Sequence, residues 1–484
     1  MPRSSNKDRL DPAMRKLIWI LILGPIAALL DVTIVNVAIE SLTRELHTSV
    51  ATIQWVNTGY MLAMGMVMPL SGWSVARFGG KRMWLVALAL FLLGSMLSGA
   101  AWNVASLIAF RVVQGVGGGL MFPIQQTLLV QAAGRAQVGK LMATISLPAV
   151  VVPILGPVIG GFILSNLDWR WIFFVNAPIC LVALALAWYG LAATEKTPGK
   201  PLDILGLGLL SPALVAILFG LSQAGHRGFD DAVVVVPLVI GVILLAGFAF
   251  HALRVRGEPI VDLRLFRKRS FAVSGIMFFL SGLGFYGSLL LLPLYYQQIR
   301  GLDALATGLM LVPQGIGALL ARGPVGRMSD SIGPRPVVLS GVLLSTVGTV
   351  FFAFAGPNTS YVLLGAALIL IGIGRGAAPV AVMAAAMQGL SRPEIPHASS
   401  ATRIMQQIGG AFGTAVFAVI LQRQLAGVAA TEHATAFNNT FWWTIGFTVL
   451  SFIPALFYPR PARQEPTEPA TPPANAPSTS KQVS

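Results

Sequence analysis

Long apolar runs recur from one end of the chain to the other, and they limit its fold more than any other feature. Fourteen runs are separated by short polar segments, and each approaches the roughly 20 residues that a helix needs to cross a bilayer. They lie at about residues 17–39, 54–75, 83–102, 105–129, 138–164, 171–192, 204–224, 232–252, 271–294, 304–321, 337–356, 361–387, 404–422 and 441–458. Only 11% of the residues are charged, whereas a soluble protein carries about 25%. The pattern predicts an all-α polytopic membrane protein with fourteen spans.

The arginines and lysines indicate how the chain is oriented. If the amino terminus is cytoplasmic, 26 of the 33 basic residues fall in cytoplasmic segments and five fall on the opposite side. Cytoplasmic loops of membrane proteins carry such an excess of basic residues. The distribution predicts an even number of spans with both termini in the cytoplasm. Because the basic residues are spread over short loops, the net charge of +15 does not indicate a nucleic-acid partner.

Two motifs occur twice in the same order and indicate an internal repeat. Gly115–Gly119 has a counterpart in Gly372–Gly376, and Gly72–Lys81 has one in Gly326–Arg335. Duplicated bundles with a site between the halves are typical of transporters. The predicted organisation is a cytoplasmic amino terminus (1–16), an amino-terminal six-helix bundle (17–192), a linker with two additional spans (193–270), a carboxyl-terminal six-helix bundle (271–458) and a disordered, proline-rich cytoplasmic tail (459–484).

Three ionisable residues fall clearly inside apolar runs, where a charge is costly and points to a function or a partner. They are Asp31, Arg111 and Arg375. A carboxylate that moves between a dry and a charge-rich environment can take up and release a proton. We predict that Asp31 couples transport to proton movement and that Arg111 tunes it. A structural ion pair for Asp31 and a clamp on backbone carbonyls for Arg111 are the alternatives.

Polar and aromatic side chains within the runs are candidate substrate contacts, since mixed surfaces of this kind suit apolar ligands. We assign this role to Asn36, Trp55, Tyr60, Gln125, Gln314 and Gln406, with core packing as the competing explanation for each. The chain has one cysteine, Cys180, and five scattered histidines, so no metal site is predicted.

Two glycine-rich segments are candidate gates. In the segment 156–161 proline removes a backbone hydrogen bond and glycine removes the side chain, so the helix should bend and approach a neighbour closely. The residues in question are Gly156, Pro157, Gly160 and Gly161, and a kinked core helix would have the same sequence. The segment 72–82 is predicted to be a tight cytoplasmic turn with a second copy at 326–335. Gate contacts are assigned to Gly72, Arg77, Gly79, Lys81, Asp330 and Arg335, although anchoring in the headgroup region would also explain the basic residues.

Four motifs in order resemble the fourteen-helix drug:proton antiporter branch of the major facilitator superfamily (EmrB/QacA-like). They are Asp31–Ala38, Arg111–Gly115, Gly156–Gly161 and Trp169–Pro178. The chain departs from the family pattern in three places: Ala76 stands where an Asp is usual, Glu40 where a Pro is frequent, and Arg375 where the branch is apolar or has Gly.

The resemblance implies two six-helix bundles joined by two central helices, and a secondary active transporter instead of an enzyme. The implied activity is export of lipophilic drugs or antibiotics across the cytoplasmic (inner) membrane by alternating access, driven by the proton gradient without a cofactor. The implied partners are a small lipophilic substrate, protons and membrane lipids, joined in a double-membrane bacterium by a periplasmic adaptor and an outer-membrane channel. A carrier that exports or imports an endogenous metabolite is the alternative, because fold does not fix the substrate.

Overall fold

The computed structural model describes residues 12–48, 50–133, 148–192, 201–255, 259–302, 304–391, 394–426, 429 and 432–458. These ranges are helical with short connections, and no strand occurs within them. The predicted tail (459–484) lies outside the described residues. The first helix begins at Pro12, before the predicted boundary at residue 17.

The helices follow the predicted order of two halves and a central pair. The amino-terminal half contains α1 (Pro12–Glu45), α2 (Val50–Val67), α3 (Leu70–Phe78), α4 (Gly80–Gly99), α5 (Val104–Ala133), α7 (Pro148–Asn166), α8 (Trp171–Phe174) and α9 (Asn176–Gly190). The central pair is α10 (Ile204–Arg227) and α11 (Ala232–Arg254). The carboxyl-terminal half contains α12 (Arg269–Leu294), α13 (Ala304–Ile332), α14 (Pro334–Ala353), α15 (Tyr361–Met387), α16 (Ile395–Leu425), α17 (His433–Leu450) and α18 (Phe452–Leu456).

Ten helical segments are long and apolar enough to cross a membrane within the described ranges. They correspond to α1, α4, α5, α8 with α9, α10, α11, α12, α14, α15 and α16. The other predicted runs are also helical, as α2 with α3, α7, α13, and α17 with α18. They are not among the ten segments that are long and apolar enough to cross a membrane. The prediction of an all-helical membrane fold is confirmed, whereas the count of fourteen spans stays a prediction.

Proline divides one run that the sequence presents as continuous. Pro69 stands at the junction between α2 and α3, where the predicted run 54–75 is interrupted. Proline has no N–H to donate and its ring crowds the preceding turn, so a helix tends to end or kink there. The run is therefore built as two consecutive helices.

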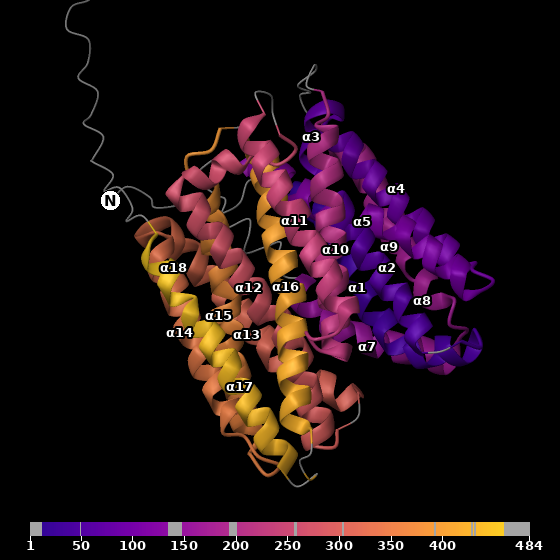
Figure 1. Cartoon of the computed structure of the whole chain (residues 1–484), viewed down its shortest axis with the longest axis vertical. Helices are drawn as coiled ribbons and strands as arrows, with labels where there is room; N and C mark the ends of the chain where they lie inside the picture. Colours follow the sequence, from indigo (N-terminus) through magenta and orange to yellow (C-terminus); the bar gives the residue numbers. More distant parts are fainter. Residues whose placement is uncertain are drawn as a thin grey trace, which may run out of the picture.

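The two halves lie side by side, with the central pair running along the line between them (Figure 1). α10 contacts α2 of the amino-terminal half and α16 of the carboxyl-terminal half. Direct contacts between the halves are made by α3 and α5 with α16 and by α7 with α13. The helices that carry most of the predicted site residues thus meet at the boundary between the halves.

Glycines of the repeated motif pack in the same way in both halves, which supports the predicted duplication. In α5, a Cβ at Gly115 or Gly119 would overlap α2, and a Cβ at Gly117 would overlap α4. In α15, a Cβ at Gly372 or Gly376 would press on α13, and one at Gly374 would overlap α14. Small residues allow such close crossings of membrane helices. The register relates α5 to α15, and it places Arg375 at the position equivalent to Gly118.

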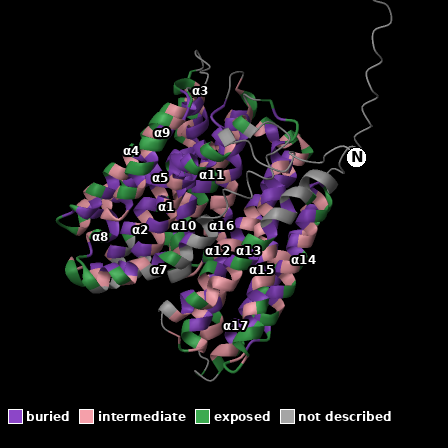
Figure 2. Ribbon diagram, turned by 180° about the vertical axis from the view of Figure 1, so that it is seen from behind, coloured by how far each residue is buried: buried purple, intermediate pink, exposed green. Residues whose placement is uncertain are grey.

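Exposed residues lie on the outside of the bundle (Figure 2), and many of them are large apolar side chains. α11 exposes Val242 and Ile243, and α9 exposes Trp188 and Tyr189. Buried side chains instead include Asp31, Arg111, Gln114 and Asn176 among others. Large exposed apolar surfaces require a nonaqueous surrounding, so this distribution fits a bundle that lies in lipid.

Candidate functional site

Asp31 of α1 and Arg111 of α5 form an ion pair in the interior of the amino-terminal half. Neither side chain is exposed. The Arg111 Nη1 group donates to Asp31 Oδ2 and to Gln114 Oε1, the latter at 2.9 Å, while Nε donates to the Val56 carbonyl at 3.2 Å. The guanidinium therefore holds a carboxylate and a backbone carbonyl at once, so the ion pair and the carbonyl clamp considered in the sequence analysis both occur, while the tuning role of Arg111 stays a prediction.

The second carboxylate oxygen of Asp31 is held by two amides. Gln114 Nε2 and Asn176 Nδ2 each donate to Asp31 Oδ1 at 2.9 Å. Asn176 also donates to Ser95 Oγ at 3.1 Å, and Ser95 donates to the Phe173 carbonyl at 2.8 Å. Helices α1, α4, α5 and α9 thereby share one hydrogen-bond network.

Aromatic rings close this network against solvent. The Arg111 guanidinium carbon lies 4.2 Å from the ring centroid of Tyr60 and 5.7 Å from that of Phe173. The Tyr60 hydroxyl and Asn176 Oδ1 are buried without a hydrogen-bond partner among the described residues. Both atoms are available when the network rearranges, and Asn176 Oδ1 could accept a proton donor on Asp31 after a simple amide rotation.

Asn176 and Ser95 were not identified as site residues from the sequence. Asn176 belongs to the Trp169–Pro178 motif, which the sequence analysis uses for the family resemblance. Nothing else in the sequence points to this asparagine as a partner of Asp31. Ser95 lies in α4 within an apolar run and is fully buried. A lone serine in such a run carries no distinguishing pattern, and its role follows only from the packing of α4 against α8 and α9.

The glycines of α7 bring this helix against α1 beside Asp31. A Cβ at Gly156 would overlap the Thr33 side chain, and one at Gly160 would lie 3.3 Å from Ile34 Cγ2. The close approach predicted for this segment is confirmed, while Gly161 faces open space. The side chain of Pro157 lies outside the described residues, and the predicted bend stays a prediction.

The predicted turn at 72–82 is wrong in its position, because residues 70–78 form the helix α3. The chain reverses at Gly79, whose φ of 88° favours glycine, and the second copy reverses at Gly333 with φ 85°. Gly72 lies instead between the halves, where a Cβ would be 3.3 Å from the Pro396 carbonyl oxygen of α16. Beside it Ser71 Oγ and Ser400 Oγ are 2.8 Å apart.

The charged residues of the two turns are placed differently. Lys81 Nζ donates to the Trp188 carbonyl at 2.7 Å, within its own half, and Arg77 is exposed. Arg335 is partly buried in the first turn of α14, and the side chain of Asp330 lies outside the described residues. Of the predicted gate residues in this motif, Gly72 is the one that the structure brings to the contact between the halves.

The candidate substrate residues do not converge on one place. Tyr60 joins the Arg111 network, and Gln125 Nε2 donates to the Leu21 carbonyl at 2.8 Å as a bond between α5 and α1. Trp55 stacks on Phe219 of α10 at a centroid distance of 5.6 Å. Gln314 is partly buried in α13, and the side chain of Asn36 lies outside the described residues.

Gln406 is bound to Arg403, which directly precedes the predicted run 404–422 and is counted among the 26 basic residues of the predicted cytoplasmic segments. α16 begins at Ile395, so Arg403 lies inside this helix and not in a cytoplasmic segment before residue 404. Arg403 Nη1 donates to Gln406 Oε1 at 2.6 Å, and its guanidinium carbon lies 4.2 Å from the ring centroid of Phe122 in α5. The spacing repeats that of Arg111 and Gln114, a signal that could have identified Arg403.

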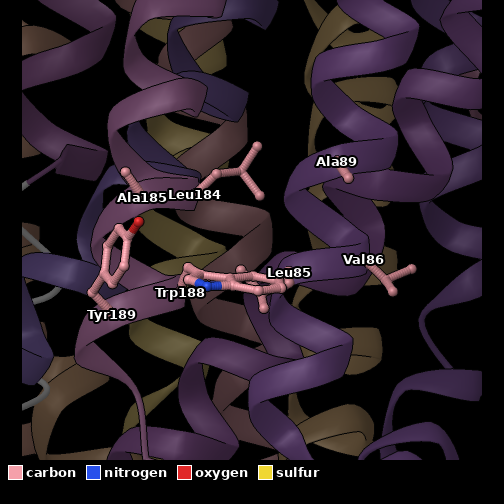
Figure 3. A pocket seen from close by; sticks show the side chains of 7 residues that line it. All are labelled: Leu85, Val86, Ala89, Leu184, Ala185, Trp188 and Tyr189. Atoms are coloured by element: carbon pink, nitrogen blue, oxygen red, sulfur yellow. The ribbon is translucent and has the colours of Figure 1, made fainter.

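An apolar surface groove lies apart from these residues, between α4 and α9 (Figure 3). It is lined by Leu85, Val86, Ala89, Leu184, Ala185, Trp188 and Tyr189. None of the predicted site residues lines it. No group of three or more His, Cys, Asp or Glu side chains that could hold a metal ion occurs in the described part of the chain.

Comparison with known proteins agrees with this architecture. The family model described as "Major Facilitator Superfamily" matches residues 21–414. The chain is 37% identical over 429 residues to the "Multidrug resistance protein B homolog" of Mycobacterium tuberculosis, covering 87% of this chain and 79% of that protein. It is 31% identical over 409 residues to the "Lincomycin resistance protein LmrB" of Bacillus subtilis, covering 83% of this chain and 84% of that protein.

The fold is also similar to a solved transporter. The proton:xylose symporter XylE superposes with a TM-score of 0.63 at 14% identity, covering 92% of this chain and 94% of that chain. At this identity the likeness concerns the fold alone. The match of the family model over most of the chain and the relatives above 30% identity place this chain in the Major Facilitator Superfamily of membrane transporters.

Proposed function

We propose that this transporter is a proton-coupled antiporter that exports lipophilic compounds, drugs among them, across the cytoplasmic membrane by alternating access. In this proposal the chain crosses the membrane fourteen times, with both termini in the cytoplasm. The observation that carries the proposal is the state of Asp31, a carboxylate with no exposed surface that is held by donors from α5 and α9. The names of the multidrug-resistance and lincomycin-resistance relatives support the substrate class.

The network offers a way for protonation to change the packing of the bundle. A proton on Asp31 removes the charge that attracts Arg111 and loosens the link between α1 and α5. Arg111 then keeps the Val56 carbonyl and Gln114 Oε1 as acceptors, so the buried cation still has hydrogen-bond partners. Because α7 packs on α1 beside Asp31 and contacts α13, the change can reach the carboxyl-terminal half.

The driving force is of the right order for this step. Breaking a buried ion pair costs about 3–5 kcal/mol. One charge moving through 100 mV supplies about 2.3 kcal/mol, and one pH unit supplies about 1.4 kcal/mol more. A proton that enters down both gradients therefore supplies a free energy comparable with the cost of opening the pair.

The test is transport into inverted membrane vesicles under an imposed proton gradient. Asp31→Asn removes the titrating group while keeping nearly the same shape, and we expect it to abolish gradient-driven uptake of a fluorescent lipophilic probe that carries no positive charge. Asp168→Asn is the matched control, because Asp168 is exposed and pairs only with Arg170 in the same half. Proton-driven uptake that survives in Asp31→Asn would refute the assignment of the proton site.

A further inference from the structure

Two arginines among the described side chains of the carboxyl-terminal half lie in helix interiors and face no carboxylate. Arg375 lies in the middle of α15, about 18 Å along the helix from its end at Met387. Its Nη2 group donates to Ser288 Oγ of α12, while Nη1 is buried and has no acceptor among the described side chains. Arg403 of α16 donates to Gln406 through Nη1, and its Nε is buried without an acceptor.

These two cations contrast with Arg111 of the amino-terminal half. Arg111 donates through Nε and both terminal nitrogens, and one of its acceptors is the Asp31 carboxylate. Arg375 and Arg403 are bound by neutral groups only. A buried charge without a counter-charge is costly, and in folded proteins such charges are paired. Among the described side chains, the interior of the carboxyl-terminal half is thus short of negative charge.

The chain does not supply the missing negative charge from its described residues. Glu394 is the acidic residue nearest along the chain to Arg403, but Lys268 Nζ donates to both of its oxygens at 2.7 and 2.9 Å. Asp31 is the one fully buried carboxylate among the described side chains, and it is paired with Arg111. Among the described residues no carboxylate is left for Arg375 or Arg403, so we look for the counter-charge in a bound ligand.

Arg403 lies where a ligand between the halves would reach, and Arg375 contacts the same helix α12. Arg403 packs on Phe122 of α5, which belongs to the other half, and Tyr286 of α12 interacts with it. Arg375 binds Ser288, two residues further along α12. Guanidinium groups recognise oxyanions with directed donors, and the rings of Phe122 and Tyr286 offer apolar surface beside them.

We infer that Arg375 and Arg403 form a subsite for the anionic group of the transported compound, so that the preferred cargo is a lipophilic organic anion such as an aromatic carboxylate. That the bound compound is transported rests on the proposed function, but the binding itself needs no proton gradient. The aromatic body of the cargo packs on the rings between the halves, and its carboxylate accepts from the free guanidinium nitrogens. A charge-assisted pair of this kind is worth about tenfold or more in affinity.

The experiment measures binding to the full chain in lipid nanodiscs with three probes that share one aromatic body. They are 1-pyrenebutyrate, its neutral amide and the corresponding ammonium compound, with empty nanodiscs as the background. We expect the carboxylate to bind about tenfold more tightly than the amide, and the ammonium compound to bind most weakly. Equal binding of the three probes, or tighter binding of the ammonium compound, would overturn the inference.

Variants assign the preference to the two arginines. In Arg375→Gln and Arg403→Gln the ratio of carboxylate to amide affinity should fall toward one, while amide binding stays near the wild-type value. Arg423→Gln is the matched control on α16, because Arg423 is exposed and pairs only with exposed Asp230; it should keep the full ratio. A ratio that persists in both test variants would contradict the assignment.

Two further variants separate folding and function from the inference. If Arg403→Gln also loses amide binding, Arg403→Lys decides the matter, since it keeps the charge and should keep the carboxylate preference; loss of the preference there overturns the inference. Asp31→Asn should bind the carboxylate with the wild-type preference. Arginine-dependent binding without proton-driven transport would refute the proposed function alone, and driven transport without a carboxylate preference would refute the inference alone.

Discussion

The coupling between Asp31 and Arg111 can be measured by removing the two charges singly and together. Arg111→Gln leaves the carboxylate with amide donors only, and Asp31→Asn leaves the guanidinium with a carbonyl and an amide oxygen. Each single substitution strands a buried charge, so each should lower the free energy of unfolding by about 3–5 kcal/mol. The double variant strands no buried charge, so its cost should be smaller than the sum of the two single costs, although it also loses the bond to the Val56 carbonyl.

The single cysteine of the chain provides the assay. Cys180 is fully buried in α9, so a thiol-reactive dye labels it only when the bundle opens. Labelling of the purified protein in mild detergent with increasing denaturant gives the free energy of unfolding of each variant. No other thiol contributes to the signal.

A matched cycle on the exposed pair of Asp168 and Arg170 serves as the control. These side chains are 3.4 Å apart at the surface of the same half, and surface pairs contribute about 0–1 kcal/mol. For the buried pair, the two single costs should exceed the double cost by several kcal/mol. Independent sites add within about 0.3–0.5 kcal/mol, so additive costs at Asp31 and Arg111 would refute the reasoning that one charge is held by the other.

Three further predictions concern packing, topology and pH. Gly156→Ala should lower the free energy of unfolding by about 1–3 kcal/mol because its Cβ would overlap α1, whereas Gly161→Ala, which meets open space, should be nearly neutral in the same Cys180 assay. A cysteine introduced as Asp230→Cys should react with an impermeant maleimide in intact cells, and one introduced as Ser484→Cys should react only after permeabilisation; external labelling at 484 would contradict the proposed topology. Burial raises the pKa of Glu394, but hydrogen bonds from Lys268 and Ser391 outweigh it and hold the pKa below the ordinary 4.5. The stability that this pair contributes is therefore present above about pH 4.5 and is lost as the pH falls through the lower folded-state pKa. Denaturant unfolding followed by tryptophan fluorescence should give a higher free energy of unfolding for the wild type than for Glu394→Gln at pH 7. The difference between the two should disappear in acid.

Much of the fold follows from the sequence, because long apolar runs and the basic residues of the loops between them predict the membrane spans. The glycine motif at 115–119 and its copy at 372–376 predict the duplication, since close helix crossings require small residues at fixed spacing. The break at Pro69 was missed because the flanking residues stay apolar, and hydropathy does not register the loss of a backbone hydrogen bond.

The site was harder to predict than the fold. Asp31 and Arg111 stand out because a charge in an apolar run is conspicuous, and the structure does bring them together. Arg403 was assigned to a loop because it directly precedes an apolar run, and only the start of α16 at Ile395 places it inside the bundle. Ser95 became identifiable only once four helices were packed, since hydrogen-bond partners distant in the chain leave no local pattern.

The way α10 is attached to its neighbours has a consequence for movement. It is tied to α2 by the hydrogen bond from Ser211 to the Met66 carbonyl at 2.7 Å and by the stacking of Trp55 on Phe219. Toward α16 it contributes apolar side chains, among them Ile217 and Leu221 against Ala415. Dispersion contacts slide at little cost, whereas a hydrogen bond in a dry setting must be broken. If the halves move against each other as the proposed function requires, we expect the central pair to stay with the amino-terminal half and α10 to slide along the apolar face of α16.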